Sequence, residues 1–181
     1  TTMTRETCFL TTKDFTILEV MRDRCLGRDD TLALILKRKI ETATVMFRDD
    51  IPVNVATLSS RVTFSVDGRD PDTRIISPDR MTSPIGMYLP ITTGRGLALL
   101  GLSEGQDFAV ANGDGDEERI VLHEVHYQPE AARREQEAFE RAGAQTSRKP
   151  RLRVIRRALH DLSRLVPAAH YGFDDPGPSA A

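Results

Sequence analysis

The sequence predicts an α+β protein with a short N-terminal antiparallel helical hairpin, an antiparallel sheet with one inserted helix, and a C-terminal helical extension. Three observations predict this class. Apolar residues recur at helical spacing over 13–45, they alternate with polar residues from Val53 onward, and the composition becomes strongly charged after Pro129. The corresponding domains are expected at 1–48, 49–129 and 130–181.

Two helices are expected in the first domain. The first covers Lys13–Arg24 and follows an N-cap at Thr12. The second runs from Leu32 to about Val45, with Asp30 or Thr31 as its cap and an apolar stripe along one side. Only a few residues separate them, so they should pack as an antiparallel helical hairpin.

Residues 53–127 show the period of two that is typical of half-buried strands. Clusters of Asp, Gly, Asn and Pro separate the runs and indicate turns. Four or five antiparallel strands are therefore expected, at Val53–Val66, Thr73–Ser77, Ile85–Leu89, Phe108–Ala111 and Glu118–Tyr127.

The stretch Tyr88–Phe108 reads as strand, turn, short helix, turn and strand. Pro90 stops the first strand because proline has no backbone donor, and Thr92 or Thr93 is placed to cap the helix. The leucines of Leu97–Leu102 make this helix too apolar and too short to exist without a sheet to cover. We expect them in the core.

After Gln128 the sequence predicts a charged helix at Glu130–Ala142, a break at Gly143–Pro150 and a basic amphipathic helix at Arg151–Val166. From 148 to 164 there are seven Lys and Arg residues against the single Asp161. Such a helix could contact nucleic acid or an acidic protein groove, could lie on an anionic membrane, or could dock its leucines on its own domain or on a second subunit. A membrane is the least favoured of these, and a dimer is conceivable.

The overall composition argues against several classes. The net charge of -2 is not that of a protein that binds nucleic acid with its whole surface, and no apolar run approaches the roughly 18 residues of a membrane span. Residues 1–6 lack the apolar core of a signal peptide, and Cys8 and Cys25 are too few for a disulfide framework. A cytoplasmic protein is expected.

No motif predicts catalysis, a cofactor or a metal site. His123 and His126 are three apart, whereas a helical zinc motif needs a spacing of four, and on a strand these two positions should face opposite sides. Asn112–Asp116 lacks the loop length of a calcium hand, and Thr93–Gly96 is not a phosphate loop. We therefore expect a protein that is not an enzyme.

Four runs together resemble a known family: Ile51-Pro52 with Val55–Phe64, Ile76–Asp79, Gly94 with Leu97–Gln106, and Val121–Glu130. They are similar to the Rnk-type regulators of nucleoside diphosphate kinase, which belong with the GreA/GreB transcription elongation factors. The match covers roughly 13–130. It implies a Gre-like C-terminal domain with an FKBP-like fold and binding to RNA polymerase near its secondary channel, without prolyl isomerase activity. Thr92–Gly96 and the extension after Glu130 depart from the family pattern.

Gre factors stimulate transcript cleavage with acidic residues on the tip of a long coiled coil. Each arm here reaches only about 20 Å at ~1.5 Å per residue, whereas an arm of about thirty residues spans ~45 Å. Asp29 and Asp30 lie at the predicted tip beside Arg28, where a cap and helix-dipole role explains them better than a role as Mg²⁺ ligands. A polymerase-binding regulator without cleavage stimulation is therefore predicted.

Three segments are candidates for the partner-binding surface. They are the hairpin tip, the turn before the inserted helix and the basic C-terminal helix, with the residues Arg28, Asp29, Asp30, Thr92, Thr93, Arg95, Arg153, Arg156 and Arg157. The alternative hypothesis is a protein- or nucleic-acid-interaction module that works through Arg151–Val166. Truncation after Glu130 should separate the two, because only the second hypothesis predicts that partner binding disappears.

Overall fold

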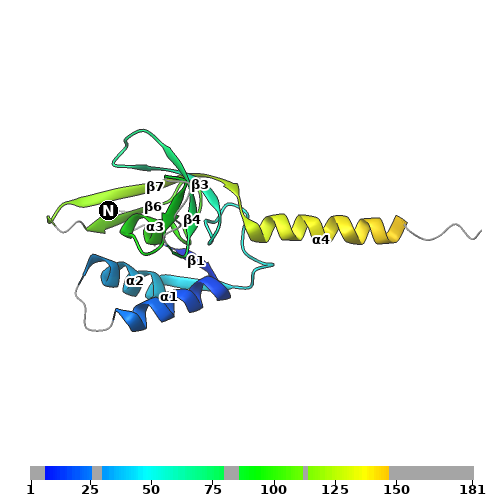
Figure 1. Ribbon diagram of the computed structural model, residues 1–181, viewed down its shortest axis with the longest axis horizontal. Coiled ribbons are helices and arrows are strands. Elements are labelled where there is room, and N and C mark those ends of the chain that lie inside the picture. The colour runs from blue at the N-terminus through cyan, green and yellow to red at the C-terminus, as the bar shows by residue number, and fades with distance from the viewer. Residues whose placement is uncertain (1–6, 26–29, 80–85, 112–113, 147–181) are drawn as a thin grey trace, which may run out of the picture.

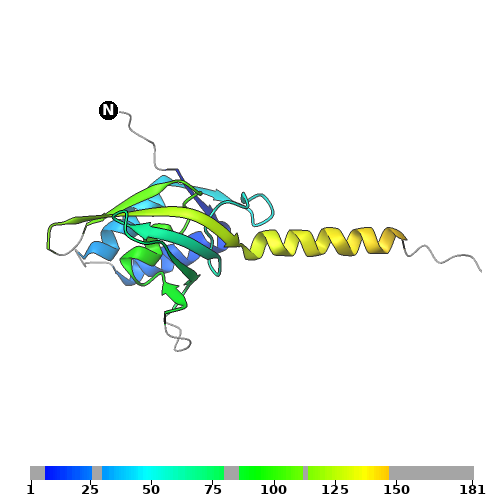
Figure 2. The same cartoon turned by 90° about the horizontal axis from the view of Figure 1, so that it is seen from above.

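The computed structural model describes residues 7–25, 30–79, 86–111 and 114–146. A five-stranded sheet forms one layer, α3 lies against it, and the α1–α2 hairpin lies on the far side of α3 (Figure 1). A long helix, α4, projects away from this body (Figures 1 and 2). The chain is an α+β protein, as predicted.

The hairpin is flanked by two short strands that pair in parallel. Its elements are β1 at Cys8–Thr11, α1 at Thr12–Arg24, α2 at Thr31–Thr42 and β2 at Ala43–Met46. Asp30 caps α2, which confirms one of the two predicted alternatives. The cap of α1 is Thr11 rather than the predicted Thr12. The predicted extension of the second helix to Val45 is wrong, because the β-branched run after Thr42 pairs with β1 instead.

The sheet has the strand order β5-β4-β3-β7-β6. Its strands are β3 at Arg61–Val66, β4 at Asp72–Ser77, β5 at Tyr88–Pro90, β6 at Asp107–Ala111 and β7 at Glu117–Tyr127. All neighbouring pairs are antiparallel except β4 and β5, which are parallel. The expectation of a wholly antiparallel sheet is corrected at this pair, because alternation along a strand carries no information about the direction of its neighbour.

The predicted strand from Val53 begins only at Arg61. Residues 53–60 instead make turns with one isolated bridge between Val55 and Ser103, and Ser59 adopts a left-handed backbone with a φ of 68°. Val55, Ala56 and Leu58 are nevertheless buried. The apolar alternation of this segment therefore reflects a buried loop rather than a strand.

Helix α3, Gly94–Leu99, is the centre of the core. Thr93 caps it, and Leu97, Leu99, Leu100 and Leu102 are buried, which confirms their predicted core role. Lys39 of α2 is also fully buried, and its Nζ donates to the carbonyl oxygens of Ala98 at 2.5 Å and Leu100 at 2.6 Å. The hairpin is thus joined to the inserted helix by both apolar packing and polar contacts.

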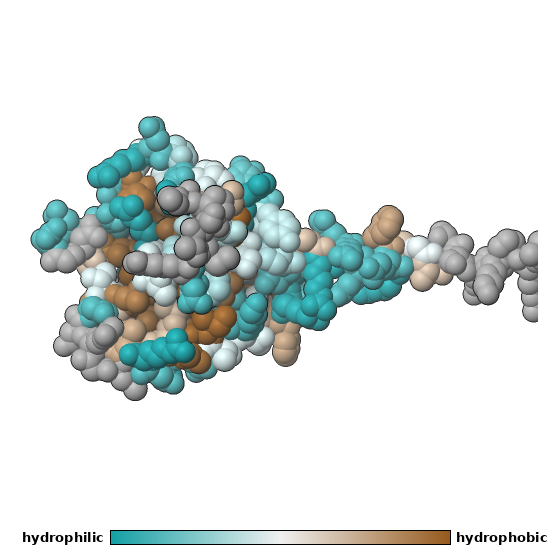
Figure 3. All heavy atoms as spheres, viewed as in Figure 1, coloured by the Kyte–Doolittle hydropathy of each residue, from teal (hydrophilic) through white to brown (hydrophobic). Residues whose placement is uncertain are grey.

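Helix α4 spans Pro129–Thr146, so it runs through the beginning of the predicted break at Gly143–Pro150. Glu137 pairs with Arg133 at 2.9 Å and with Arg141 at 3.8 Å, one helical turn away on either side. Phe139 is 80% exposed, and the described part of α4 is largely hydrophilic (Figure 3). The predicted basic helix Arg151–Val166 lies outside the described residues. No helix in the described ranges has the length and apolar character that crossing a membrane requires.

Candidate partner-binding site

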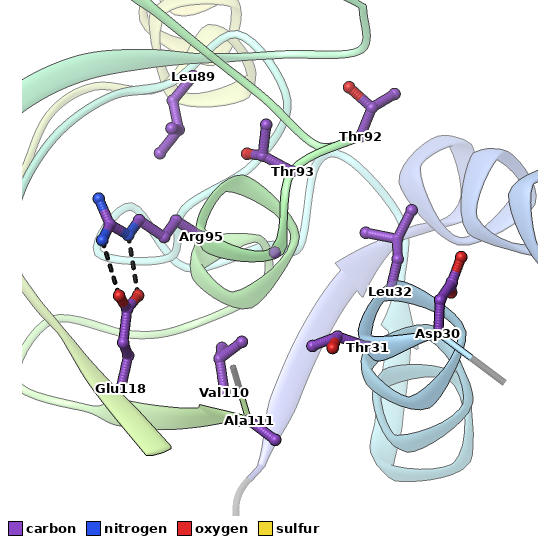
Figure 4. Close-up of a pocket in the computed structure, with 11 residues that line it drawn as sticks. Asp30, Thr31, Leu32, Leu89, Thr92, Thr93, Arg95, Val110, Ala111 and Glu118 are labelled. Atoms are coloured by element: carbon purple, nitrogen blue, oxygen red, sulfur yellow. Dashed lines mark hydrogen bonds and ion pairs between the residues drawn. The ribbon is translucent and has the colours of Figure 1, made fainter. Parts of the chain in front are cut away.

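A hollow of about 700 Å³ separates the start of α2 from the start of α3 and the adjacent ends of β6 and β7 (Figure 4). We call it the hairpin groove. Apolar side chains of Leu32, Leu89 and Val110 line part of it, and Asp30, Thr92, Thr93, Arg95 and Glu118 supply its polar lining. In the space-filling view, hydrophobic side chains gather between the sheet and the hairpin (Figure 3).

The groove brings together two segments that the sequence analysis treated separately. Asp30 belongs to the predicted hairpin tip, and Thr92, Thr93 and Arg95 belong to the turn before the inserted helix. Arg28 and Asp29, as well as Arg153, Arg156 and Arg157, lie outside the described residues. The described candidates therefore form one surface, not two.

Local hydrogen bonds hold the turn before α3 in place. The Ile91 backbone donates to the Ser77 carbonyl at 2.9 Å, and the Ile91 side chain is fully buried. The Thr93 hydroxyl donates to the Pro90 carbonyl at 2.6 Å and accepts from the Gly96 backbone at 3.2 Å. Thr93 is thus engaged in capping, which leaves exposed Thr92 as the threonine of this turn that is free to meet a partner.

Arg95 is held by a carboxylate that sequence reasoning missed. Its guanidinium donates to both oxygens of Glu118, at 2.8 and 3.0 Å, and the Glu118 side chain is only 18% exposed (Figure 4). The hydrogen bond to Glu118 is the main reason that the pKa of Arg95 is raised. Glu118 carries no motif and is 23 residues away, so only the fold identifies it as the partner.

Asp30 is placed on the opposite side of the groove from the Arg95–Glu118 pair (Figure 4). One of its carboxylate oxygens accepts from the Ala33 backbone at 2.9 Å. This contact confirms the predicted capping role. Because the carboxylate is already engaged at the helix start, Asp30 is a poorer ligand for a metal than an unengaged carboxylate would be.

A second hollow, of about 260 Å³, adjoins the first and shares Arg95 and Leu89 with it. Arg69 and Arg74 line it together with Asp70 and Asp72, and Arg74 pairs with Asp72 at 2.7 Å. Arg95 therefore lies between the hairpin groove and this second hollow, which has more charged residues in its lining.

The two histidines of β7 correct one expectation. His123 shares a hydrogen bond with the Ser65 hydroxyl at 2.8 Å, and His126 shares one with the Thr63 hydroxyl at 2.6 Å. Thr63 and Ser65 are two residues apart on β3 and therefore point to the same face of the sheet, so both histidine rings reach that face. This is possible because an irregularity in the β3–β7 pairing shifts the register between Thr63 and Phe64. Within the described ranges, no group of three His, Cys, Asp or Glu side chains is placed to hold a metal ion.

Cys8 shows no sign of an activated nucleophile. Its thiol is buried and donates weakly to the Leu100 carbonyl at 3.7 Å. Burial raises the pKa of this thiol, although Lys39 acts in the opposite direction.

No protein-family model matches this sequence, and no curated protein matches it. Among solved structures, the chain is similar to a GreA/GreB transcription elongation factor from Nitrosomonas europaea, with 26% identity over 66% of this chain and 99% of that chain and a TM-score of 0.49. It is also similar to Gfh1, GreA factor homolog 1, of Thermus thermophilus, with 13% identity over 67% of this chain and 99% of that chain and a TM-score of 0.33. Gfh1 of Thermus aquaticus gives the same values. At these TM-scores the similarity by itself assigns neither a family nor a partner.

Proposed function

We propose that this chain is a non-enzymatic regulator of the Gre/Rnk type that binds RNA polymerase at its secondary channel without stimulating transcript cleavage. The observation that carries the proposal is the set of four family-like runs, because the fold joins them by hydrogen bonds. The Ser59 backbone donates to the Ile76 carbonyl at 2.7 Å, and the Ala56 backbone donates to the Leu102 carbonyl at 2.9 Å.

The closing run is tied in the same way. The Gly105 backbone donates to the Leu122 carbonyl at 2.8 Å, and the Gln128 amide donates to the Val55 carbonyl at 2.8 Å. Four segments spread over 51–130 therefore make one interlocked unit. Such contacts are what a shared architecture behind the resemblance requires, and they support the proposal in this sense.

The length of the hairpin supports the absence of cleavage stimulation. Helix α1 has 13 residues and α2 has 12. At ~1.5 Å per residue each reaches about 20 Å, less than half of the ~45 Å of a thirty-residue arm. A tip on this stalk would stay at the mouth of a channel that a Gre factor enters, where it could still compete with other channel factors.

The hairpin groove is our candidate for the polymerase contact. A pull-down with core RNA polymerase, competed by a Gre factor, tests the proposal. Arg95→Ala should weaken binding, whereas Arg119→Ala is the matched control, because Arg119 forms a similar exposed pair with Asp107 and does not line the groove. No binding at micromolar protein would contradict the proposal, and equal losses for both variants would contradict the assignment of the groove.

Cleavage is tested separately on stalled elongation complexes. The wild-type chain should leave the transcript length unchanged. Transcript shortening that is lost in an Asp29→Asn or Asp30→Asn variant would show that the short hairpin does reach the polymerase active site, and it would overturn this part of the proposal.

The second candidate function is a protein- or nucleic-acid-interaction module that uses the basic segment after α4. The projection of α4 away from the body favours it, because the end of α4 that precedes this segment in the sequence lies away from the body (Figure 2). The structure also improves the discriminating truncation. Glu130 and Arg134 contact the body, at Thr57 and at the Arg48 carbonyl, so the chain should be cut after Thr146 rather than after Glu130. Polymerase binding that survives this cut supports the first function, and loss of partner binding supports the second.

A further inference from the structure

The start of α4 and the start of α1 meet on the buried loop 55–60. One carboxylate oxygen of Asp14, in the first turn of α1, accepts from the Leu58 backbone at 3.3 Å. One carboxylate oxygen of Glu130, in the first turn of α4, accepts from the Thr57 hydroxyl at 2.7 Å. Asp14 and Glu130, which are far apart in the sequence, thus accept hydrogen bonds from two consecutive residues of the loop. We call Asp14, Thr57, Leu58 and Glu130 the α1–α4 junction.

Asp14 is an unusual carboxylate in this junction. It is 1% exposed, and its second oxygen, Oδ1, has no hydrogen-bond partner. The Oε1 atom of Gln128, which stands two residues before Glu130 and is 3% exposed, also lacks a partner. Both atoms are acceptors, so the junction is short of donors, and a buried acceptor without a donor is costly.

The charged groups around Asp14 do not compensate for its burial. Glu130 faces it from α4 and disfavours its ionised form, whereas Lys13 on α1, the Leu58 N–H and Thr11 favour that form. The loop residues 55–60 include no titratable side chain. Burial is the largest effect, and the pKa of Asp14 is raised from 3.8 to about 6.

We propose that the α1–α4 junction is a proton-operated clasp, which holds the base of α4 against the body while Asp14 is protonated and loosens it when Asp14 ionises. A proton on Asp14 removes one of two nearby negative charges and turns an unpartnered buried acceptor into a donor. Ionisation leaves the charged carboxylate of Asp14 buried near the charge of Glu130.

Helix α4 is the element that should move. Helix α1 is anchored by Leu18, which is fully buried in the core. Helix α4 contacts the body through its first turns, by Glu130 on Thr57 and by Arg134 on the Arg48 carbonyl, and it then projects away (Figures 1 and 2). Releasing its base admits water to the carboxylates without opening the core.

The direction of the pH effect follows from the sign of the shift. A carboxyl with a raised pKa binds its proton more tightly in the closed junction than in the open one. The closed junction is therefore most favoured below the ordinary pKa of 3.8, loses favour as the pH rises from there to about 6, and does not change further above that value. One pKa unit corresponds to a factor of ten, so a shift of about two units limits the change in the opening equilibrium to about a hundred-fold.

Amide hydrogen exchange of the full chain tests the clasp, with rates corrected for their intrinsic pH dependence. Protection of amides 132–134 should fall by roughly ten-fold or more between pH 4 and pH 6.5 and should then level off. In Asp14→Asn the profile should be flat over this range. In Glu130→Gln, which keeps an acceptor for Thr57 but removes the like charge, the fall should be smaller and should level off at a lower pH.

Glu140→Gln is the matched control on the same helix, because Glu140 accepts from Gln136 and takes no part in the junction. It should follow the wild type. Identical profiles in the wild type and in Asp14→Asn would overturn the proposal. If Asp14→Asn does not fold, the profile of Glu130→Gln decides, since a clasp that depends on these two charges cannot leave it unchanged. Neither result depends on whether the chain binds RNA polymerase.

Discussion

Gly96 is the position at which the structure makes its sharpest stability prediction. A Cβ atom added there would lie 2.1 Å from the Pro90 carbonyl oxygen and 2.7 Å from the Pro90 carbonyl carbon. Both are backbone atoms, so α3 must move away from β5 by about 1 Å to reach an ordinary contact distance. This movement would disturb the packing of Leu97 and Leu99, which are fully buried.

The magnitude follows from two opposing effects of Gly96→Ala. Overpacking of a close-packed site costs about 1–3 kcal/mol, and more where backbone has to shift. Alanine regains up to about 1 kcal/mol through its higher helix propensity. We expect a net loss of about 2 kcal/mol, which corresponds to a fall in Tm of roughly 4–8 °C for a chain of this size.

Gly143→Ala is the matched control, because Gly143 is also helical but has no atom within 4 Å of an added Cβ. This variant should keep the wild-type Tm and make α4 more helical, by about 1 kcal/mol at that position. Thermal unfolding followed by circular dichroism measures both. A Gly96→Ala variant as stable as the wild type, or no less stable than Gly143→Ala, would refute the close approach of α3 to β5.

Three further predictions concern polar groups. The pKa of Asp14 is raised from 3.8 to about 6, so the free energy of unfolding should decline by about 3 kcal/mol as the pH rises from below 3.8 to above 6. Urea unfolding of Asp14→Asn should show no such decline. An unchanged decline in this variant would contradict the buried environment of Asp14. Lys39→Met removes the donor to the Ala98 and Leu100 carbonyls, so we expect a loss of about 2–4 kcal/mol in the same assay, and a stabilised variant would count against these contacts. Glu118→Gln breaks a partly exposed ion pair with Arg95, so the free energy of unfolding should change by less than about 1 kcal/mol; a larger loss would mean that the pair is structural.

Features with a local physical cause could be predicted from the sequence. Asp30 was recognised as a possible cap because its side chain acts within one turn of its own helix. The leucines of α3 were placed in the core because a helix this short and apolar must be covered. The hairpin of β6 and β7 follows from two alternating runs around a turn-forming segment.

Part of the candidate site could also be predicted. Thr92, Thr93, Arg95 and Asp30 were chosen from their positions at helix starts, and all four line the hairpin groove. Glu118 could not be found in this way, since an acidic residue on an alternating strand has no distinguishing local signal. Asp14 was missed for the same reason: it meets Leu58, which is 44 residues away, and the charge of Glu130 only in the folded chain.

The amino-acid sequence by itself determined where the helices of the hairpin begin to within one residue, which residues of α3 are buried and that the class is α+β, because capping and hydrophobic periodicity act over a few residues. Only the tertiary structure decided that residues 53–60 form a loop whose apolar residues from Val55 onward are buried, that β5 runs parallel to β4, and that Asp30 and the turn before α3 share one groove. These features depend on which distant segments meet. Burial produces the same apolar alternation in a loop as in a strand. The residues next to a strand or to a charged side chain determine neither the direction of the neighbouring strand nor the partner of the charge.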